Sequence, residues 1–358
     1  MKPLIAAFAL VLTQFTAAQQ PEPIDWARAQ SLHQRAQRGE KLSPEEQAYY
    51  ERAKAERNKR PPGDQTVPKP PAGLIPLTDM TGDDRYQGED GGLYGGGKNT
   101  PPPAHEAAAK AALAQIQPLG PDGKPSASGR IVFVSISMSN ATQEFSRFKT
   151  IADVDPRKSS TLTIVDCAQG GQAMAEWVPR DGGPWKTALQ RINSAGVTPE
   201  QVQIAWVKLA NKGPRGTLQE HGRKLEADTL AVLQNARAHF PNLRVAYLGS
   251  RIYGGYATSM LNPEPYAYDS AFAARWLIQR QIKRDPELAA EKSPLLLWGP
   301  YFWADGTKGR KTDALVWERT DFAQDGTHPS ESGRNKVAQM LLEFVTTNPL
   351  ARGWFTGK

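Results

Sequence analysis

Five short apolar runs, each separated from the next by a helical stretch, dominate the sequence from Gly129 onward. The runs are four to six residues long and rich in aliphatic side chains, which favours buried β-strands. They span Ile131–Ile136, Leu162–Asp166, Gln203–Lys208, Arg244–Leu248 and Leu295–Trp298. Strands that alternate with helices predict a parallel, doubly wound sheet covered by helices on both faces. We therefore expect one α/β domain over residues 129–358.

The helices of this domain are predicted from the stretches between and after the strands. They cover Glu144–Ala152, Trp185–Ser194, Leu218–His239 and Tyr268–Lys283. A last helix has the clearest pattern, because its apolar residues recur at positions i, i+3, i+4, i+7 and i+8: Val337, Met340, Leu341, Phe344 and Val345. Docking of that apolar stripe on the sheet would fix the loop just before the helix.

Residues capable of acyl-transfer chemistry follow these strands. In parallel α/β sheets functional groups collect at the carboxyl ends of the strands. Ser139 lies just after the first strand, and Asp325 and His328 stand three residues apart in the loop before the last helix. A serine, a histidine and an aspartate in such positions can form a nucleophilic triad. Ser137 competes with Ser139, and so does Ser135, which we place within the strand.

The chain resembles the SGNH, or GDSL-type, hydrolase superfamily, whose motifs supply a serine, a glycine, an asparagine and an Asp-x-x-His pair in that order. The resemblance covers roughly residues 129–347. It implies a three-layer, flavodoxin-like fold with a five-stranded parallel sheet. It also implies a catalytic triad and an oxyanion hole, the triad from Ser139, His328 and Asp325, and the hole from the Ser139 and Gly171 amides and the Asn211 side chain.

Two of the four motifs depart from the family pattern. Ser137 and Met138 stand where the first motif has glycine and aspartate. Leu209 replaces the glycine of the third motif, and Lys212 follows Asn211. These changes indicate a divergent branch with a differently shaped pocket.

The activity implied by the resemblance is that of a cofactor-independent serine esterase, with O-acyl groups on carbohydrate as one substrate hypothesis. Aromatic residues after the fourth and fifth strands either line a cleft on which sugars stack or belong to the core: Tyr253, Tyr256, Tyr266, Tyr268, Trp298, Tyr301, Phe302 and Trp303. The alternative to an enzyme is a non-catalytic module of the same fold that binds carbohydrate or a surface partner.

The first residues have the pattern of a secretory signal. Lys2 precedes an apolar stretch from Leu4 to Phe15, and small residues end at Ala18 before Gln19. The sequence therefore predicts a signal peptide over residues 1–18 and a secreted or periplasmic protein. An uncleaved anchor is the alternative, but the apolar run is shorter than the roughly 20 residues that a membrane span needs.

Two extensions precede the α/β domain. Residues 19–60 are predicted to form a helical hairpin in which Asp25 and Ser43 cap the helices, Glu46 completes a capping box and Gly39 ends the first helix. It is a spacer, or it mediates surface attachment. Residues 61–128 are rich in proline and glycine and predict a linker or wrapping loop with a helix near residues 104–115. The near-match to a phosphate-binding GxxxxGK pattern at residues 92–98 lacks the flanking strand and helix, so we interpret it as a flexible loop near the active site.

Composition excludes several other classes. The net charge is +7, but basic and acidic residues are mixed and no nucleic-acid motif is present. The five histidines show no metal-ligand spacing, so we expect no metal and no cofactor. Cys167 is the only cysteine and we expect it to be packed. Asn140 opens a formal glycosylation sequon, yet its place beside Ser139 argues against a sugar there.

Overall fold

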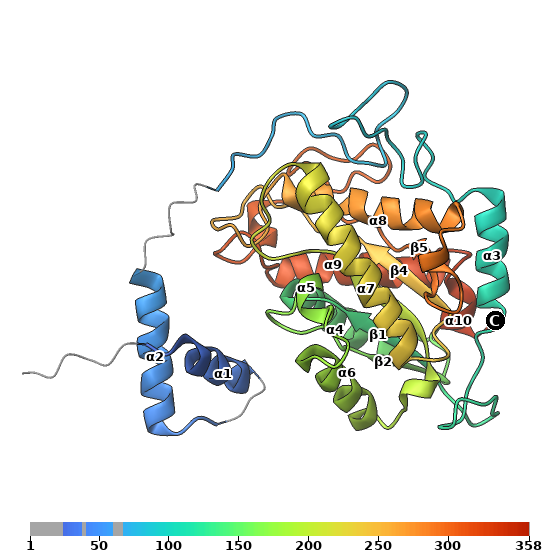
Figure 1. The fold of residues 1–358 in the computed structure, drawn as a ribbon, viewed down its shortest axis with the longest axis horizontal. Helices are drawn as coiled ribbons and strands as arrows, with labels where there is room; N and C mark the ends of the chain where they lie inside the picture. Colours follow the sequence, from blue (N-terminus) through green and yellow to red (C-terminus); the bar gives the residue numbers. More distant parts are fainter. Residues whose placement is uncertain (1–23, 38–40, 60–66, 358) are drawn as a thin grey trace, which may run out of the picture. The chain divides into compact units, whose positions relative to one another are not determined.

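The computed structural model describes residues 24–37, 41–59 and 67–357 (Figure 1). The predicted signal peptide over residues 1–18 and Gly39 lie outside these described residues. The chain divides into two units, Met1–Asp64 and Gln65–Lys358. Within the described residues, no helix has both the length and the apolar character needed to cross a bilayer.

The first unit contains two helices in contact, α1 (Trp26–Gln37) and α2 (Pro44–Lys59). The predicted capping box is confirmed, because the Glu46 N–H donates to Ser43 Oγ at 3.2 Å and the Ser43 N–H donates to the Glu46 carboxylate at 2.9 Å. Leu32 and Ala53 are buried, and Arg35 pairs with Glu46 at 2.6 Å. A small apolar seam and the Arg35–Glu46 ion pair are therefore among the contacts that hold the described part of the hairpin together.

The second unit is built on a five-stranded, entirely parallel sheet in the order β2-β1-β3-β4-β5. The strands are β1 (Ile131–Ile136), β2 (Leu162–Val165), β3 (Val202–Lys208), β4 (Val245–Gly249) and β5 (Leu295–Trp298). They lie within one residue of the predicted bounds at each end. Nearly every strand residue is buried, as expected when helices cover both faces.

Helices cover the two faces of this sheet and complete a three-layer α/β fold (Figure 1). Phe133, Trp206 and Tyr247 contribute to the apolar core on one face, and Val134 and Ala205 to the core on the other. The first face is covered by α3 (Pro103–Leu113), α4 (Ser139–Asp153), α9 (Glu331–Thr347) and α10 (Arg352–Thr356). The second is covered by α5 (Met174–Trp177), α6 (Gly183–Ser194), α7 (Arg223–His239) and α8 (Tyr266–Ile282).

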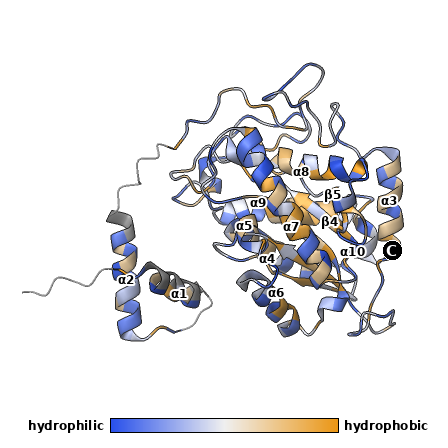
Figure 2. Ribbon diagram, in the orientation of Figure 1, coloured by the Kyte–Doolittle hydropathy of each residue, from blue (hydrophilic) through white to orange (hydrophobic). Residues whose placement is uncertain are grey.

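Hydropathy follows these layers: strands β4 and β5 are apolar, whereas α7 and α8 carry both apolar and polar residues (Figure 2). The apolar stripe predicted for the last helix is confirmed, since Val337, Leu341 and Val345 are all buried against the sheet. The expected helix over Leu218–His239 is divided, with a π-helical turn at Leu218–Gly222 before α7.

Helix α4 begins at Ser139, five residues earlier than predicted. Met138 is still extended, with φ −100° and ψ −168°, so strand β1 passes into the helix almost without a connecting loop. The apolar pattern from which the helix was predicted begins only at Glu144, because the first turn carries small and polar residues. The consequence is that Ser139 is held by a helix terminus.

Residues 67–128 belong to the second unit and pack on its α/β core. The Tyr301 hydroxyl accepts a hydrogen bond from the Leu77 N–H, and the Trp298 indole donates to the Leu93 carbonyl at 2.7 Å. Arg275 of α8 is fully buried and donates to the Asp90 carbonyl at 2.5 Å. Residues 92–98, interpreted from sequence as a flexible loop near the active site, dock against α8 and Trp298, because the Gln279 side chain donates to the Tyr94 carbonyl and the Trp298 indole donates to the Leu93 carbonyl.

The first turn of α4 is anchored by Asp166, which follows β2. Its carboxylate accepts hydrogen bonds from Ser135 Oγ and Thr142 Oγ1, both at 2.5 Å, and from the Ala168 N–H at 3.2 Å. Burial raises the pKa of Asp166 to about 6, although these hydrogen bonds and the charge of Arg191 act in the opposite direction. Asp166 therefore joins β1, β2 and α4 just behind Ser139.

Asp166→Asn should change how stability depends on pH. Because the folded-state pKa lies above the unfolded one, the favourable contribution of protonated Asp166 is complete below about pH 4 and is lost as pH rises through about 6. Asparagine does not ionise, so the variant should keep this contribution at every pH. Its free energy of unfolding relative to that of the natural protein should therefore increase by about 1–2 kcal/mol between pH 4 and 7. Denaturant unfolding at several pH values measures this, with the exposed Asp181→Asn as control. Parallel pH curves for Asp166→Asn and the natural protein would contradict it.

Candidate active site

The structure brings Ser139, His328 and Asp325 together at the carboxyl edge of the sheet. Ser139 Oγ lies 2.7 Å from His328 Nε2, and His328 Nδ1 lies 2.6 Å from Asp325 Oδ2. Ser139 is the first residue of α4, and the other two belong to the loop that precedes α9. A hydroxyl, an imidazole and a carboxylate in this order have the geometry needed to activate a serine nucleophile.

The loop that carries His328 is ordered by Asp325 itself. Asp325 Oδ1 accepts hydrogen bonds from the Thr327 and His328 N–H groups, each at 3.0 Å. Partial burial raises the pKa of Asp325, but these bonds and the His328 ring outweigh burial and hold that pKa well below its usual range. The carboxylate therefore stays ionised and fixes the imidazole with Nε2 toward Ser139.

The competing serines are both buried and engaged elsewhere. Ser135 accepts hydrogen bonds from the Cys167 and Ala168 N–H groups and donates to Asp166. Ser137 donates to the Lys208 carbonyl. Neither contacts His328, so of the three serines only Ser139 has the position of a nucleophile.

A buried ion pair lies beneath the site. Lys208, at the end of β3, binds Glu144 of α4 with an Nζ–Oε1 distance of 2.6 Å, and both side chains are fully buried. Burial lowers the pKa of Lys208 to about 8 in spite of the Glu144 charge. Removing one partner of such a pair typically costs about 3–5 kcal/mol. The pair therefore fixes α4 on the sheet one turn after Ser139.

A small pocket of about 40 Å³ opens beside Ser139. Its apolar wall is a cluster formed by Met138, Ala173 and Ala210. Its other lining residues are Ser139, Asn140, Gly171, Asn211, Lys212, Arg251, Leu261, Asn262 and Thr327. A space little larger than one water molecule suits a short acyl group.

Both further residues expected in the oxyanion hole, Gly171 and Asn211, line this pocket. Gly171 has φ +75°, a conformation that favours glycine. The Asn211 amide donates to Asp228 at 2.6 Å, and its oxygen accepts from the Ala175 N–H. Since an amide nitrogen carries two hydrogens, Asn211 keeps a second donor. Lys212 donates to the Gly171 carbonyl at 3.0 Å, which joins the loop after β3 to the loop after β2.

The one buried cation that lines this pocket in the described part of the chain was missed from the sequence. Arg251 stands two residues after β4, lines the pocket, and is only 2% exposed. Its Nε donates to Asn262 Oδ1 at 3.0 Å, while Nη1 has no partner among the described residues. The available signal was a cation placed directly after a predicted strand, at the edge where parallel strands end.

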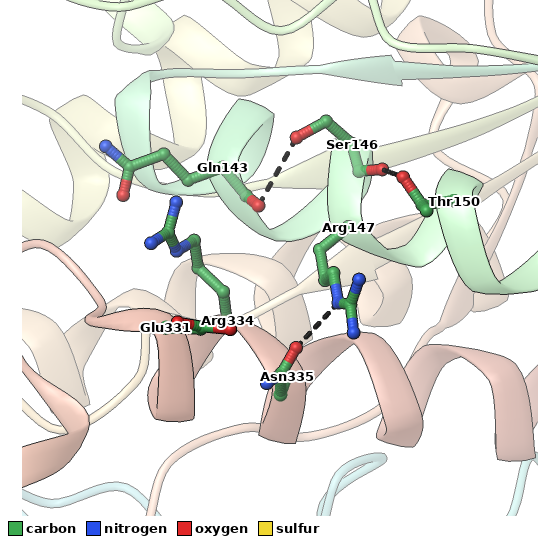
Figure 3. A pocket seen from close by; sticks show the side chains of 7 residues that line it. All are labelled: Gln143, Ser146, Arg147, Thr150, Glu331, Arg334 and Asn335. Atoms are coloured by element: carbon green, nitrogen blue, oxygen red, sulfur yellow. Dashed lines mark hydrogen bonds between the residues drawn. The ribbon is translucent and has the colours of Figure 1, made fainter.

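A shallow polar groove lies between α4 and α9 (Figure 3). Arg147 of α4 reaches across to Asn335 of α9, with an Nε–Oδ1 distance of 2.6 Å. The remaining lining residues are Gln143, Ser146, Thr150, Glu331 and Arg334. The groove starts one turn beyond Ser139 and His328, since α4 and α9 both begin at the site.

Most of the aromatic cluster belongs to the core, which decides between the two alternatives considered for it. None of its members lines the pocket beside Ser139. Six are at most 9% exposed: Tyr266, Tyr268, Trp298, Tyr301, Phe302 and Trp303. Tyr253 and Tyr256 are partly buried and pack edge to face, with 5.1 Å between their ring centroids. The prediction that these residues together form a sugar-stacking cleft is therefore wrong.

Other sequence candidates also have clear positions. Asn140 is buried and donates to the Thr327 carbonyl at 2.8 Å, so it ties α4 to the His328 loop and is not open to glycosylation. Cys167 is fully buried, and burial raises the pKa of its thiol. Within residues 24–37, 41–59 and 67–357, no group of three or more acidic, histidine or cysteine side chains is placed to hold a metal.

Comparison with known proteins gives only distant structural likeness. No protein-family model matches the sequence, and no curated protein matches it. Three similar solved structures are a gut microbial diltiazem-metabolizing enzyme, an extracellular lipase from Streptomyces rimosus and a GDSL-like lipase from Bacteroides thetaiotaomicron. Their identities to this chain are 14%, 10% and 12%, and the TM-scores are 0.36, 0.34 and 0.26. The alignments cover 63%, 60% and 67% of this chain and 48%, 99% and 95% of the other chains. At these values the likeness alone decides no function.

Proposed function

We propose that this protein is a serine esterase of the SGNH type that hydrolyses esters of short acyl groups. The observation that carries the proposal is the continuous hydrogen-bonded chain from Ser139 Oγ through His328 to Asp325, with distances of 2.7 and 2.6 Å, beside a small pocket. Each residue comes from the motif position that the superfamily resemblance assigns to it.

The proposed reaction proceeds through an acyl-enzyme. Ser139 Oγ attacks the carbonyl carbon of the ester while His328 Nε2 takes its proton. The alcohol leaves with that proton, and the acyl group stays on Ser139. Water then attacks the acyl-enzyme, His328 again takes a proton, and the carboxylic acid is released as Ser139 recovers its hydrogen. Asp325 orients the imidazole and stabilises its charge throughout.

Negative charge on the carbonyl oxygen would be stabilised by the Ser139 and Gly171 N–H groups and the remaining Asn211 hydrogen. Ser139 occupies the first position of α4, where a backbone N–H has no partner within the helix. The partial positive charge of a helix N-terminus also favours an oxyanion there. All three residues line the same pocket, which supports this assignment.

The short-acyl preference follows from the pocket, and the alcohol portion remains a hypothesis. Export is inferred from the predicted signal peptide, and an O-acylated carbohydrate is one substrate of an exported enzyme. Because the aromatic side chains are in the core, this carbohydrate hypothesis rests on export and the family resemblance alone.

Ser139→Ala should abolish ester hydrolysis. With the nucleophile removed we expect kcat/KM for an acetyl-ester probe to fall at least about 1,000-fold, and a fluorophosphonate should no longer label the protein. The matched control is Ser146→Ala, an exposed serine two turns along the same helix, which should keep activity and labelling. Hydrolysis that survives Ser139→Ala would refute the proposal. Carbohydrate binding without labelling or turnover in the natural protein would favour the non-catalytic module.

Asn211→Ala should lower kcat about 100- to 1,000-fold with little change in KM, because one donor to the transition-state oxyanion is lost. Asn193→Ala, at an exposed position of α6, provides the control. Since Asn211 also bonds to Asp228 and Ala175, the melting temperature must be measured in parallel. A folded Asn211→Ala protein with near-normal kcat would remove this residue from the oxyanion hole.

A further inference from the structure

We propose that Arg251 forms a subsite for an anionic group, a carboxylate, on the ester substrate, so that the enzyme prefers acidic esters. This inference rests on the proposed esterase function and assigns a substrate class to the same pocket. It depends on the burial of Arg251, on its missing hydrogen-bond partner, and on its position beside Ser139.

Arg251 differs from the other buried cations of the protein. Among the described residues, the lysines and arginines that are at most 5% exposed are Lys208, Arg251, Arg275 and Arg310. Lys208 pairs with Glu144, Arg275 with Glu89 and Asp90, and Arg310 with Asp313. Arg251 makes no ion pair within the described part of the chain, and the side-chain partner of its guanidinium is the neutral amide of Asn262.

Three carboxylates influence the pKa of Arg251, and each of them already accepts hydrogen bonds from another group. Burial lowers the pKa of Arg251, whereas the charges of Glu144, Glu264 and Asp325 raise it. Glu144 binds Lys208, and Asp325 binds His328. Glu264 accepts from the Trp303 indole at 2.7 Å and from two backbone N–H groups. These acids keep the guanidinium charged but leave its Nη1 without an acceptor.

A buried charge without a hydrogen-bonded counter-charge is costly, so an incoming anion would gain from meeting it. A guanidinium presents planar donors that fit the two oxygens of a carboxylate. Arg251 lines the pocket that also contains Ser139 and Asn211. A substrate can therefore place its ester at Ser139 and its carboxylate toward Arg251.

The carboxylate can belong to either half of the ester, and two pairs of probes separate these sources. Monomethyl succinate against methyl butyrate places the charge on the acyl chain. An O-acetylated methyl uronoside against an O-acetylated methyl hexoside places it on the alcohol. Acid release is followed at constant pH for each probe.

In at least one pair, the natural protein should hydrolyse the anionic member with a kcat/KM about 10-fold or more above that of the neutral member. Arg251→Met should lower kcat/KM for the anionic ester about 10- to 100-fold, the usual range for a lost charged hydrogen bond, and change the neutral ester by less than about threefold. Arg251→Lys keeps the charge but loses the planar fork, so an intermediate fall is expected. This second variant also serves if Arg251→Met does not fold.

The controls are Arg147→Met and Arg334→Met in the groove between α4 and α9, which should leave the preference unchanged (Figure 3). Loss of the preference in these variants, with Arg251 variants normal, would place the anion in the groove and overturn the proposal. An equal fall in kcat/KM for charged and neutral esters in the Arg251 variants would also overturn the proposal, because Arg251 would then act on the reacting carbonyl. Absence of any preference in the natural protein would also overturn it.

Failure of the esterase function itself would be recognised separately. If no ester is hydrolysed, calorimetric titration of the natural protein and Arg251→Lys with the anionic probes still tests the subsite. Saturable binding that weakens about 10-fold in the variant supports the subsite without catalysis. Absence of binding to both anionic probes overturns it.

Discussion

The hydrogen bond between Ser139 and His328 depends on two helices that begin at the same edge of the sheet. Helix α4 starts directly after β1, and α9 starts just after the His328 loop, with the two helices packed side by side. Asn140 joins the helix start to the loop by donating to the Thr327 carbonyl. Ser139 and His328 are 189 residues apart in sequence, so their contact depends on this packing.

Charge is buried around the site in compensated pairs. The Glu144–Lys208 pair fixes α4 on β3, and Asp166 accepts hydrogen bonds from both β1 and the first turn of α4. Desolvation offsets much of the attraction within a buried pair such as Glu144–Lys208, but removing one partner would leave the other charge uncompensated. Arg251 is the exception among the buried cations described, and it is also the one that lines the pocket.

Three of the four departures from the superfamily motifs that the sequence resembles make identifiable contacts in the structure. Ser137, in place of glycine, donates to the Lys208 carbonyl and joins β1 to β3. Met138, in place of aspartate, forms part of the apolar wall of the pocket. Lys212, after Asn211, bridges to the Gly171 carbonyl and to Glu176. Met138 and Lys212 both line the pocket beside Ser139.

The sequence by itself determined the sheet, the docked last helix and the candidate triad, because strand and helix periodicity are local properties and the order of the motifs is a property of the chain before it folds. It could not determine that α4 begins at Ser139, since small polar residues in a first turn carry no apolar pattern. Nor could it decide that the aromatic residues are core, or that Arg251 has an unpartnered nitrogen. Burial and hydrogen bonding depend on which side chains meet after folding, and only the tertiary structure decides that.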